Sequence, residues 1–260
     1  MAQEMKRALI AGFLSHPCLA GYPANMTLEP ISYECGGVEL IGYLANGSTP
    51  GSAPGILIAH ESPGITEHIK QQTLGFAKQG YVAFALDLFG AHNLDLEEAR
   101  RQSGLIVHTP GLMYARTKAG LDVLADQPTV DPTRIGAVGF CLGGAAVLEL
   151  ARHDARIQCV IGFHPGFLRP AGSLDSYISA RVLMMIGDQD PIVAQEDRLA
   201  FARAMDASSA SWELHVFGGV GHSFTNPAID SYCLTGFAYN ADAARRSWML
   251  ALGLLQETLR

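Results

Sequence analysis

The sequence lacks the features that would assign it to a membrane or to nucleic acid. No stretch approaches the roughly 18 consecutive apolar residues that a membrane-spanning helix needs. Basic residues are in the minority, and the formal net charge of −7 at pH 7 argues against nucleic acid or an anionic membrane as a partner. We therefore expect neither.

Motifs for bound cofactors are also missing. The chain contains neither the G-x-G-x-x-G fingerprint of dinucleotide-binding proteins nor a P-loop, so no nucleotide cofactor is expected. His60, Glu61 and His68 do not have the H-E-x-x-H spacing that places two histidines on one helix face for zinc. We therefore expect no catalytic metal either.

Cysteine is scarce, and its spacing forms no framework. The sequence has five cysteines, an odd number without a C-x-x-C pair, which argues against a disulfide scaffold or a zinc ribbon. This pattern favours a reducing compartment, and we expect a cytoplasmic protein. The cysteines are Cys18, Cys35, Cys141, Cys159 and Cys233.

Residues 1–28 resemble an export signal only loosely. Lys6 and Arg7 precede an apolar run over 8–14, but the run is short, and His16 with Pro17 interrupts it before any small-residue cleavage site. We interpret the segment 1–28 as an N-terminal arm or short helix.

The rest of the chain alternates between strand and helix patterns. Its 260 residues, 48% of them hydrophobic, suit one domain over 1–260. Alternating segments on either side of Gly36 and Gly37 predict a β-hairpin, and short apolar runs from residue 55 onward predict strands buried on both faces. Strands are expected over 29–35, 38–45, 55–59, 81–86, 158–163, 181–186 and 212–217, and helices over 65–79, 94–105, 112–124, 195–205 and 240–258.

This alternation predicts an α/β fold with a mostly parallel sheet, helices on both faces and the hairpin as an antiparallel edge. Two proline-containing dipeptides within 127–132 predict a turn. Residues 223–239 form the longest segment without a pattern, directly after His222, and a loop of that length in a compact domain is usually functional.

The segment 134–148 predicts a buried strand, a tight turn and a helix. Its turn carries Gly139, Cys141 and Gly143 in a G-x-C-x-G sequence, the form of the nucleophile elbow G-x-S-x-G with a thiol in place of the hydroxyl. The glycines leave out Cβ atoms that would clash in such a turn, and the positive end of the helix dipole favours a thiolate. A buried structural cysteine at a helix start is the alternative interpretation.

A thiol nucleophile needs a base and a group that orients the base. In open parallel sheets such groups gather beyond the carboxyl ends of the strands. The chain order of Cys141, an aspartate and His222 matches the nucleophile–acid–histidine order of α/β-hydrolases. Asp188 and Asp190 both follow one strand, and the pattern alone does not separate them. The ionisable residues at expected strand ends are Glu61, Asp87, Cys141, His164, Asp188, Asp190 and His222.

These motifs together make the chain resemble the dienelactone hydrolase family, thiol members of the α/β-hydrolase fold, from about Glu29 to the C-terminus. The G-F-C-L-G-G stretch followed by an aspartate and a histidine in that order is the most specific part. The resemblance is carried by Tyr33 with 42–45, by 60–61, by 80–81 with 87–90, by 139–144, by 187–190 and by 221–224.

The resemblance implies roles that the residue pattern alone leaves open. It places the triad acid at Asp190 and makes Asp188 a turn residue. It assigns Glu61 to an interaction with the nucleophile thiol that helps to form the thiolate, whereas a carboxylate buried against an arginine is the alternative for this residue. It also implies an oxyanion hole formed by the backbone N–H groups of Ser62 and Leu142, which would stabilise a tetrahedral intermediate.

One position departs from the family pattern. Members that cleave dienelactones hold the substrate carboxylate with two arginines, one of them four residues after the triad histidine, where this chain has Asn226. Arg116 is a candidate for the other arginine, with a surface helix arginine as the alternative. Three aromatic residues follow Asn226: Tyr232, Phe237 and Tyr239. They could line a pocket for a larger or less charged acyl group, or pack the loop against the sheet. Of the three, Tyr239 is the candidate for substrate binding.

We therefore expect a hydrolase of small esters or lactones. Cys141 would attack the carbonyl, His222 would act as general acid and base, and Asp190 would orient His222. The alternative is a protein that retains the fold without turnover, or a redox sensor that uses Cys141, although no resolving cysteine lies near Cys141 in the sequence. The expected partner is a small-molecule substrate, and the chain is expected to be a monomer or a homodimer.

Overall fold

The computed structural model describes residues 26–47, 52–92, 94–154, 156–167 and 177–259. The N-terminal arm or helix expected over 1–28 therefore lies outside the described residues, except at 26–28. The boundaries of the single domain stay a prediction.

One eight-stranded sheet forms the centre of the described chain, with the order β1-β2-β4-β3-β5-β6-β7-β8. The β1–β2 and β2–β4 pairs are antiparallel, and every later pair is parallel, which confirms the expected mostly parallel sheet with the hairpin at one edge. The strands are β1 (Glu29–Cys35), β2 (Val38–Ala45), β3 (Ala53–Ala59), β4 (Val82–Leu86), β5 (Val130–Phe140), β6 (Ile157–Phe163), β7 (Arg181–Gly187) and β8 (Trp212–Phe217).

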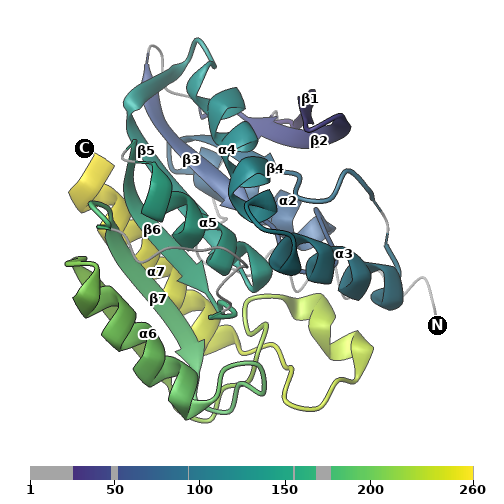
Figure 1. The fold of residues 1–260 in the computed structure, drawn as a ribbon, viewed down its shortest axis with the longest axis vertical. Helices are drawn as coiled ribbons and strands as arrows, with labels where there is room; N and C mark the ends of the chain where they lie inside the picture. The colour runs from purple at the N-terminus through teal and green to yellow at the C-terminus, as the bar shows by residue number, and fades with distance from the viewer. Residues whose placement is uncertain (1–25, 48–51, 93, 155, 168–176, 260) are drawn as a thin grey trace.

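Helices cover both faces of this sheet, as expected. One apolar cluster joins the sheet to α3, α4, α5 and α6, and a second joins its other face to α2 and α7. Figure 1 shows α4, α5 and α6 in front of the sheet and α7 behind it. The helices are α2 (Glu67–Lys78), α3 (Leu96–His108), α4 (Leu112–Ala125), α5 (Leu142–His153), α6 (Gln195–Ala207) and α7 (Ala241–Leu259).

The strand before the elbow starts earlier than the sequence predicts. β5 begins at Val130 and runs through Asp131 and Pro132, where we expected a turn. The β3–β5 and β5–β6 registers both shift in this region, so an irregular strand start accommodates the proline. The Asp131 carboxylate accepts hydrogen bonds from the Thr133 backbone and from Arg134, which holds the local conformation. Turn-forming residues therefore lie inside the strand here.

The segment after His222 is more ordered than its lack of pattern suggests. Within 223–239 a 3-10 helix, η1, spans Pro227–Tyr232, and the Asn226 side chain accepts a hydrogen bond from the Ala228 backbone at its start. So short a helix has no detectable hydrophobic period, which is why the pattern missed it. The next helix, α7, begins after Asn240, whose side chain accepts from the Ala243 backbone at 3.0 Å as a helix cap.

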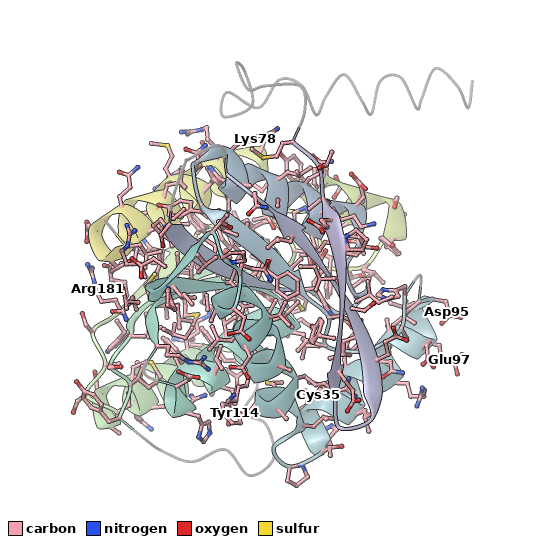
Figure 2. The ribbon with its side chains drawn as sticks, turned by 90° about the horizontal axis from the view of Figure 1, so that it is seen from above. Cys35, Lys78, Asp95, Glu97, Tyr114 and Arg181 are labelled. Carbon is pink, nitrogen blue, oxygen red and sulfur yellow. The ribbon has the colours of Figure 1, made fainter. Side chains whose placement is uncertain are left out.

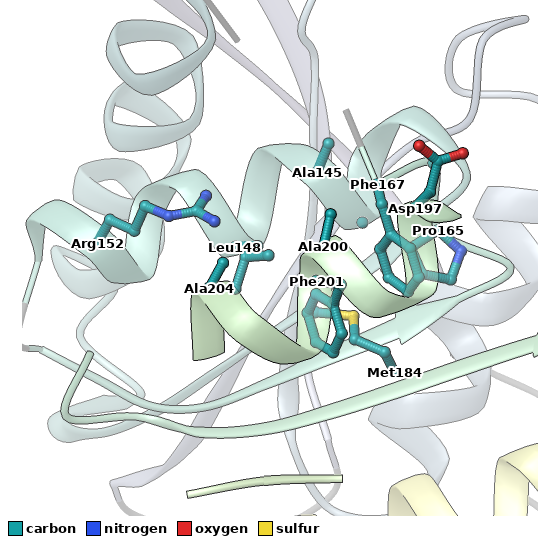
Figure 3. A pocket seen from close by; sticks show the side chains of 12 residues that line it. Ala145, Leu148, Arg152, Pro165, Phe167, Met184, Asp197, Ala200, Phe201 and Ala204 are labelled. Atoms are coloured by element: carbon teal, nitrogen blue, oxygen red, sulfur yellow. The ribbon is translucent and has the colours of Figure 1, made fainter. Parts of the chain in front are cut away.

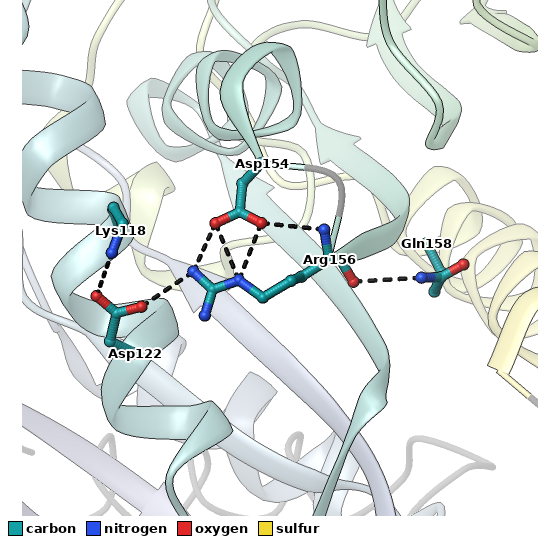
Figure 4. Close-up of polar contacts among 5 residues, drawn as sticks. All are labelled: Lys118, Asp122, Asp154, Arg156 and Gln158. Carbon is teal, nitrogen blue, oxygen red and sulfur yellow. Dashed lines mark hydrogen bonds and ion pairs between the residues drawn. The ribbon is translucent and has the colours of Figure 1, made fainter.

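Opposite charges meet where α4, the end of α5 and the start of β6 come together (Figure 4). Asp122 pairs with Lys118 at 2.5 Å and with Arg156 at 2.9 Å. Arg156 also pairs with Asp154 at 2.5 Å. Because α4 and α5 run back from the carboxyl ends of the strands, these pairs lie at the amino end of the sheet.

Candidate active site

Cys141 stands in strained backbone between β5 and α5. Its φ of 50° and ψ of −113° lie in a region that non-glycine residues rarely adopt. Its backbone N–H donates to Phe163 O at 3.1 Å, and its carbonyl accepts from Gly144 and Gly166. The elbow is therefore held by hydrogen bonds to β6 and to the segment after it.

The two glycines beside Cys141 are required by close backbone contacts. A Cβ on Gly139 would lie 2.1 Å from Gly143 O, and a Cβ on Gly143 would lie 2.1 Å from Ala59 O at the end of β3. No side chain fits at either position unless the backbone moves. Their role is thus tight packing of the turn onto its neighbours.

His222 is bonded to one of the two neighbouring aspartates. Its Nδ1 lies 2.6 Å from Asp190 Oδ2, and both side chains are fully buried. Asp190 Oδ1 also accepts from the Ile192 backbone at 2.8 Å. Asp188 instead accepts from the Gly219 and Val220 backbones. The geometry separates the residues that the pattern could not: Asp190 faces the histidine, and Asp188 holds the turn after β8.

Nδ1 of His222 is taken by Asp190, so Nε2 is the ring nitrogen left for Cys141. Burial by itself would lower the pKa of His222, but the charge of Cys141 and the hydrogen bonds of the ring with Asp190 and with Cys141 outweigh it and raise the pKa to about 10. Cys141 is therefore close enough to act on this imidazole electrostatically, as a thiol and its base must be.

Glu61 is buried directly after β3 and has an amide partner. Its Oε1 accepts from Asn226 Nδ2 at 2.7 Å, and the side chain of Asn226 also accepts from the Ala228 backbone. Burial raises the pKa of Glu61 to about 7, against the opposing effects of His222 and Asn226. No arginine in the described part of the chain is paired with Glu61, and Asn226 is its partner instead.

Sequence reasoning noted Asn226 as a lost arginine and missed this partnership. The available signal was its position, four residues after His222, where the family pattern already expects a side chain that points into the site.

Backbone groups near Glu61 are the candidates for an oxyanion hole. His60 Nε2 accepts from the Leu88 backbone, so Nδ1 carries the proton and donates to Glu61 O at 2.7 Å. The Ser62 hydroxyl lies 2.7 Å from the Ser103 hydroxyl in α3. The N–H of Ser62 has no acceptor among the described residues, and Leu142, as the first residue of α5, has no intrahelical acceptor for its N–H. Their assignment as oxyanion donors stays a prediction.

Arg116 and Tyr239, the two residues expected to bind substrate, have fewer described contacts with the other candidate site residues. Arg116 is buried in α4, its Nε and Nη1 have no partner among the described residues, and its charge acts on Tyr33. No described contact joins Arg116 to Cys141 or His222. Tyr239 is partly buried, its N–H donates to Asp230, and burial raises the pKa of its phenol. Both assignments stay predictions.

The remaining residues named from the sequence have clear positions. Phe237 packs edge-on against the His222 ring with centroids 4.9 Å apart, whereas Tyr232 is exposed. Asp87 accepts from the backbones of Ile41, Phe89 and Gly90, so it ties the hairpin to β4. Phe237 therefore belongs to the site, and Asp87 is structural.

A small cavity of about 130 Å³ lies between α5 and α6 (Figure 3). Gly144, Ala145 and Leu148 line it from α5, and Ala200, Phe201 and Ala204 line it from α6. Cys141, Asp190, His222 and Glu61 are not among its lining residues. It adjoins the elbow helix, and none of these four candidate residues opens onto it.

Comparison with known proteins places this geometry in a family. The dienelactone hydrolase family model matches residues 40–259. The chain belongs to the dienelactone hydrolase family. A solved structure of a dienelactone hydrolase-like promiscuous phosphotriesterase from metagenomic libraries is 32% identical, with a TM-score of 0.86, and the match covers 90% of this chain and 99% of that one.

Two further relatives agree with this assignment. A Bradyrhizobium sp. protein described as a probable 2-oxo-3-(5-oxofuran-2-ylidene)propanoate lactonase is 29% identical over 236 residues, which covers 86% of this chain and 92% of that protein. The crystal structure of a dienelactone hydrolase from Anabaena variabilis is 20% identical with a TM-score of 0.65, covers 90% of this chain and 99% of that one, and supports the fold alone. The chain is thus a hydrolase of this family with an α/β-hydrolase fold.

The remaining expectations concern location and bound groups. No helix in the described part of the chain is long and apolar enough to cross a membrane. Within those same residues, no group of three or more His, Cys, Asp or Glu side chains is arranged to hold a metal ion. The cytoplasmic location, the absence of a cofactor and the oligomeric state stay predictions.

Proposed function

We propose that the chain hydrolyses small esters or lactones through the thiol of Cys141. The observation that carries this proposal is the buried Asp190–His222 pair at 2.6 Å, whose imidazole also has its pKa raised by the charge of Cys141 and by a hydrogen bond with the Cys141 side chain. A thiol at an elbow, a base and a carboxylate that orients the base are the parts needed for covalent catalysis of acyl transfer.

The proposed reaction proceeds in two halves. His222 takes the thiol proton, the sulfur attacks the carbonyl carbon, and the carbonyl electron pair moves to the oxygen, where the N–H groups of Ser62 and Leu142 stabilise it. Collapse of this intermediate breaks the carbon–oxygen ester bond, and the leaving alkoxide takes the proton from His222. Water, activated by His222, then attacks the thioester, releases the acid and restores the thiol.

Glu61 gives the site a second proton-transfer group. With a pKa near 7, its carboxyl exchanges its proton within the neutral range, in which general acids and bases work best. This supports a part for Glu61 in setting the charge of the Cys141 thiol. Asn226 is uncharged and already uses one Nδ2–H on Glu61, so it cannot offer a substrate carboxylate the charge-assisted, two-pronged contact of an arginine.

The redox alternative finds little support in the structure. Cys159 is fully buried, and burial raises its pKa to about 11. Cys35 lies at the tip of the hairpin (Figure 2), and Cys233 follows η1. Each of the three is free, and none is joined to Cys141 by a described contact.

The test is a comparison of cysteine variants on several substrates. We would measure kcat/KM for p-nitrophenyl acetate, a dienelactone and an uncharged phosphotriester, the last because the 32% identical relative is described as a phosphotriesterase. Cys141→Ala should lose roughly 10³-fold or more on every accepted substrate, and the control Cys35→Ala should retain wild-type rates.

Wild-type activity in Cys141→Ala would refute the thiol mechanism. A wild-type protein inert on all three substrates, with Cys141 still rapidly alkylated by iodoacetamide, would favour the non-catalytic or redox alternative.

A further inference from the structure

A buried row of polar side chains beside the triad is not used by the proposed mechanism. The Thr225 hydroxyl lies between two imidazoles, 2.7 Å from His164 Nε2 and 3.2 Å from His68 Nε2. His164 follows β6 and His68 lies in the first turn of α2, so the row joins two separate elements to the loop after β8. All three side chains are buried.

The protons in this row are constrained. A hydroxyl can donate to only one acceptor, so at least one of the two rings must carry its proton on Nε2 and donate to Thr225. Burial lowers the pKa of His68 to about 3 and that of His164 well below its ordinary value. Both rings are therefore neutral at neutral pH, and the row works through hydrogen bonds rather than charge.

The loop that this row holds carries two groups of the site. His222 lies three residues before Thr225, and Asn226, the partner of Glu61, follows it directly. The Asn226 N–H also donates to Ser223 O at 2.9 Å, which closes the turn that Thr225 occupies. A displacement of Thr225 would therefore move Asn226, and Glu61 with it.

His164 contacts the catalytic imidazole itself. Its ring packs edge-on against the His222 ring, with centroids 5.2 Å apart. Phe237 also contacts the His222 ring. The backbone of His164 has a φ of 39°, a left-handed conformation that is unfavourable for a residue with a Cβ. Such strain persists only where the surrounding contacts impose it, and here they bring the ring between Thr225 and His222.

We propose that His68, Thr225 and His164 form a neutral clamp that positions the His222 ring and the Asn226–Glu61 pair. In this proposal Thr225 and His164 are positioning residues for the reaction. The part of the test that measures turnover rests on the proposed function.

Several titratable groups face this region, and the test must account for each. His222 is faced by Cys141 from the start of α5, by Asp190 from the loop after β7, by Glu61 from the end of β3 and by His164 from the end of β6. Of these, Glu61 has its pKa near 7, and the bond to Asn226 holds that pKa below the value that burial alone would give. A loosened clamp should therefore raise the pKa of Glu61.

The experiment compares Thr225→Val, which keeps the shape and removes the hydroxyl, with Thr225→Ser, which keeps the hydroxyl. Thr225→Val should lower kcat/KM by roughly 10- to 100-fold, the size of effect expected from small displacements of catalytic groups, and Thr225→Ser should stay within about threefold. His164→Phe keeps a ring against His222 and should reproduce the loss. The double variant should be no worse than the more impaired single variant, because both changes break the same contact.

A second measurement does not depend on turnover. The rate of Cys141 alkylation by iodoacetamide is followed against pH in wild type and in Thr225→Val, Thr225→Ser, His164→Phe and Glu61→Gln. The step near pH 7 assigned to Glu61 should move to higher pH in Thr225→Val, stay in place in Thr225→Ser and vanish in Glu61→Gln. This distinguishes the two proposals, since a failed esterase assay leaves the alkylation profile readable.

The clamp is refuted if Thr225→Val and Thr225→Ser behave alike, in kinetics and in the alkylation profile, whether both match wild type or both are impaired. It is also refuted if the effects of Thr225→Val and His164→Phe simply add. Thermal midpoints of all variants are recorded, and should Thr225→Val fail to fold, His164→Phe decides the question by the same profile.

Discussion

The two ends of the central sheet hold their ionisable groups in opposite surroundings. At the amino end Lys118, Asp122, Asp154 and Arg156 are partly exposed, and each has a partner of opposite charge. At the carboxyl end Glu61 is buried against the Asn226 amide, and within the described residues no cation is bonded to it. The charges at the amino end are paired and fasten elements together, whereas Glu61 at the carboxyl end has a pKa near neutrality and can change its protonation state.

Backbone strain follows the same division. The described non-glycine residues with positive φ are Cys141, His164, Ser209, Ser223 and Cys233, and three of them, Cys141, His164 and Ser223, belong to the candidate site or adjoin it. Strained backbone costs stability and is retained where the surroundings impose it, often at functional sites. The contrast makes a general prediction: changes at the carboxyl end should affect activity, and changes at the amino end should leave activity unchanged.

The largest effect is expected at the aspartate that faces His222. Asp190→Asn should lower kcat by roughly 10³- to 10⁴-fold, as removal of the orienting aspartate does in a serine-protease triad. The matched control is Asp188→Asn, since the described hydrogen bonds of the Asp188 side chain go to the Gly219 and Val220 backbones, and it should leave kcat within about threefold. Steady-state kinetics of both variants checks the prediction, and equal losses would mean that the orienting carboxylate is misassigned.

A second prediction concerns pH and Glu61. Burial raises its pKa from an ordinary value of 4.5 to about 7, so the unfolded chain loses this proton first as pH rises. The folded state therefore loses stability between about pH 4.5 and pH 7, and Glu61→Gln, which cannot ionise, avoids the loss. Relative to wild type, Glu61→Gln should gain roughly 2 to 3 kcal/mol of unfolding free energy between pH 5 and pH 8.

Urea denaturation at both pH values measures this difference. Asp154→Asn, at the amino end, is the control: the Asp154 pKa is lowered by Arg156 against the effect of burial, so its contribution is complete above pH 5 and should not change up to pH 8. A Glu61→Gln difference that is flat across this range would mean that Glu61 is ionised throughout.

The smallest effect is expected in the amino-end network. Arg156→Ala removes pairs to Asp122 and Asp154 that are partly exposed, and should lower the unfolding free energy by about 1 kcal/mol or less, and less still at high salt. Its kcat should equal that of wild type. A marked loss of activity in this variant would show that the two ends of the sheet are coupled.

The fold was largely predictable because its signals are local. Short apolar runs alternating with amphipathic segments place β3 to β8 within a few residues, and Gly36 with Gly37 marks the hairpin. The exceptions are a strand start through Pro132 and the short helix η1, where register shifts and side-chain caps override the local pattern. Such features depend on contacts between segments far apart in the sequence.

The site was predictable residue by residue but not in its contacts. Cys141 and His222 were recognisable from turn chemistry and chain order. The choice of Asp190 over Asp188 needed a family resemblance or the hydrogen bonds seen in the structure. The bond between Asn226 and Glu61 joins residues 165 positions apart, and nothing in either local segment predicts it. The clamp around Thr225 was invisible for the same reason.

The central claim is that Cys141 carries the acyl group, and the mass of the protein during turnover tests it most directly. Wild-type protein is mixed with p-nitrophenyl acetate, quenched with acid within the first turnovers and digested for mass spectrometry. Hydrolysis of a thioester by water is the slow step for a thiol enzyme, so the account predicts one acetyl group on the Cys141 peptide and none in Cys141→Ala. Continued ester hydrolysis with Cys141 unmodified, or with the acetyl group on another residue, would contradict it.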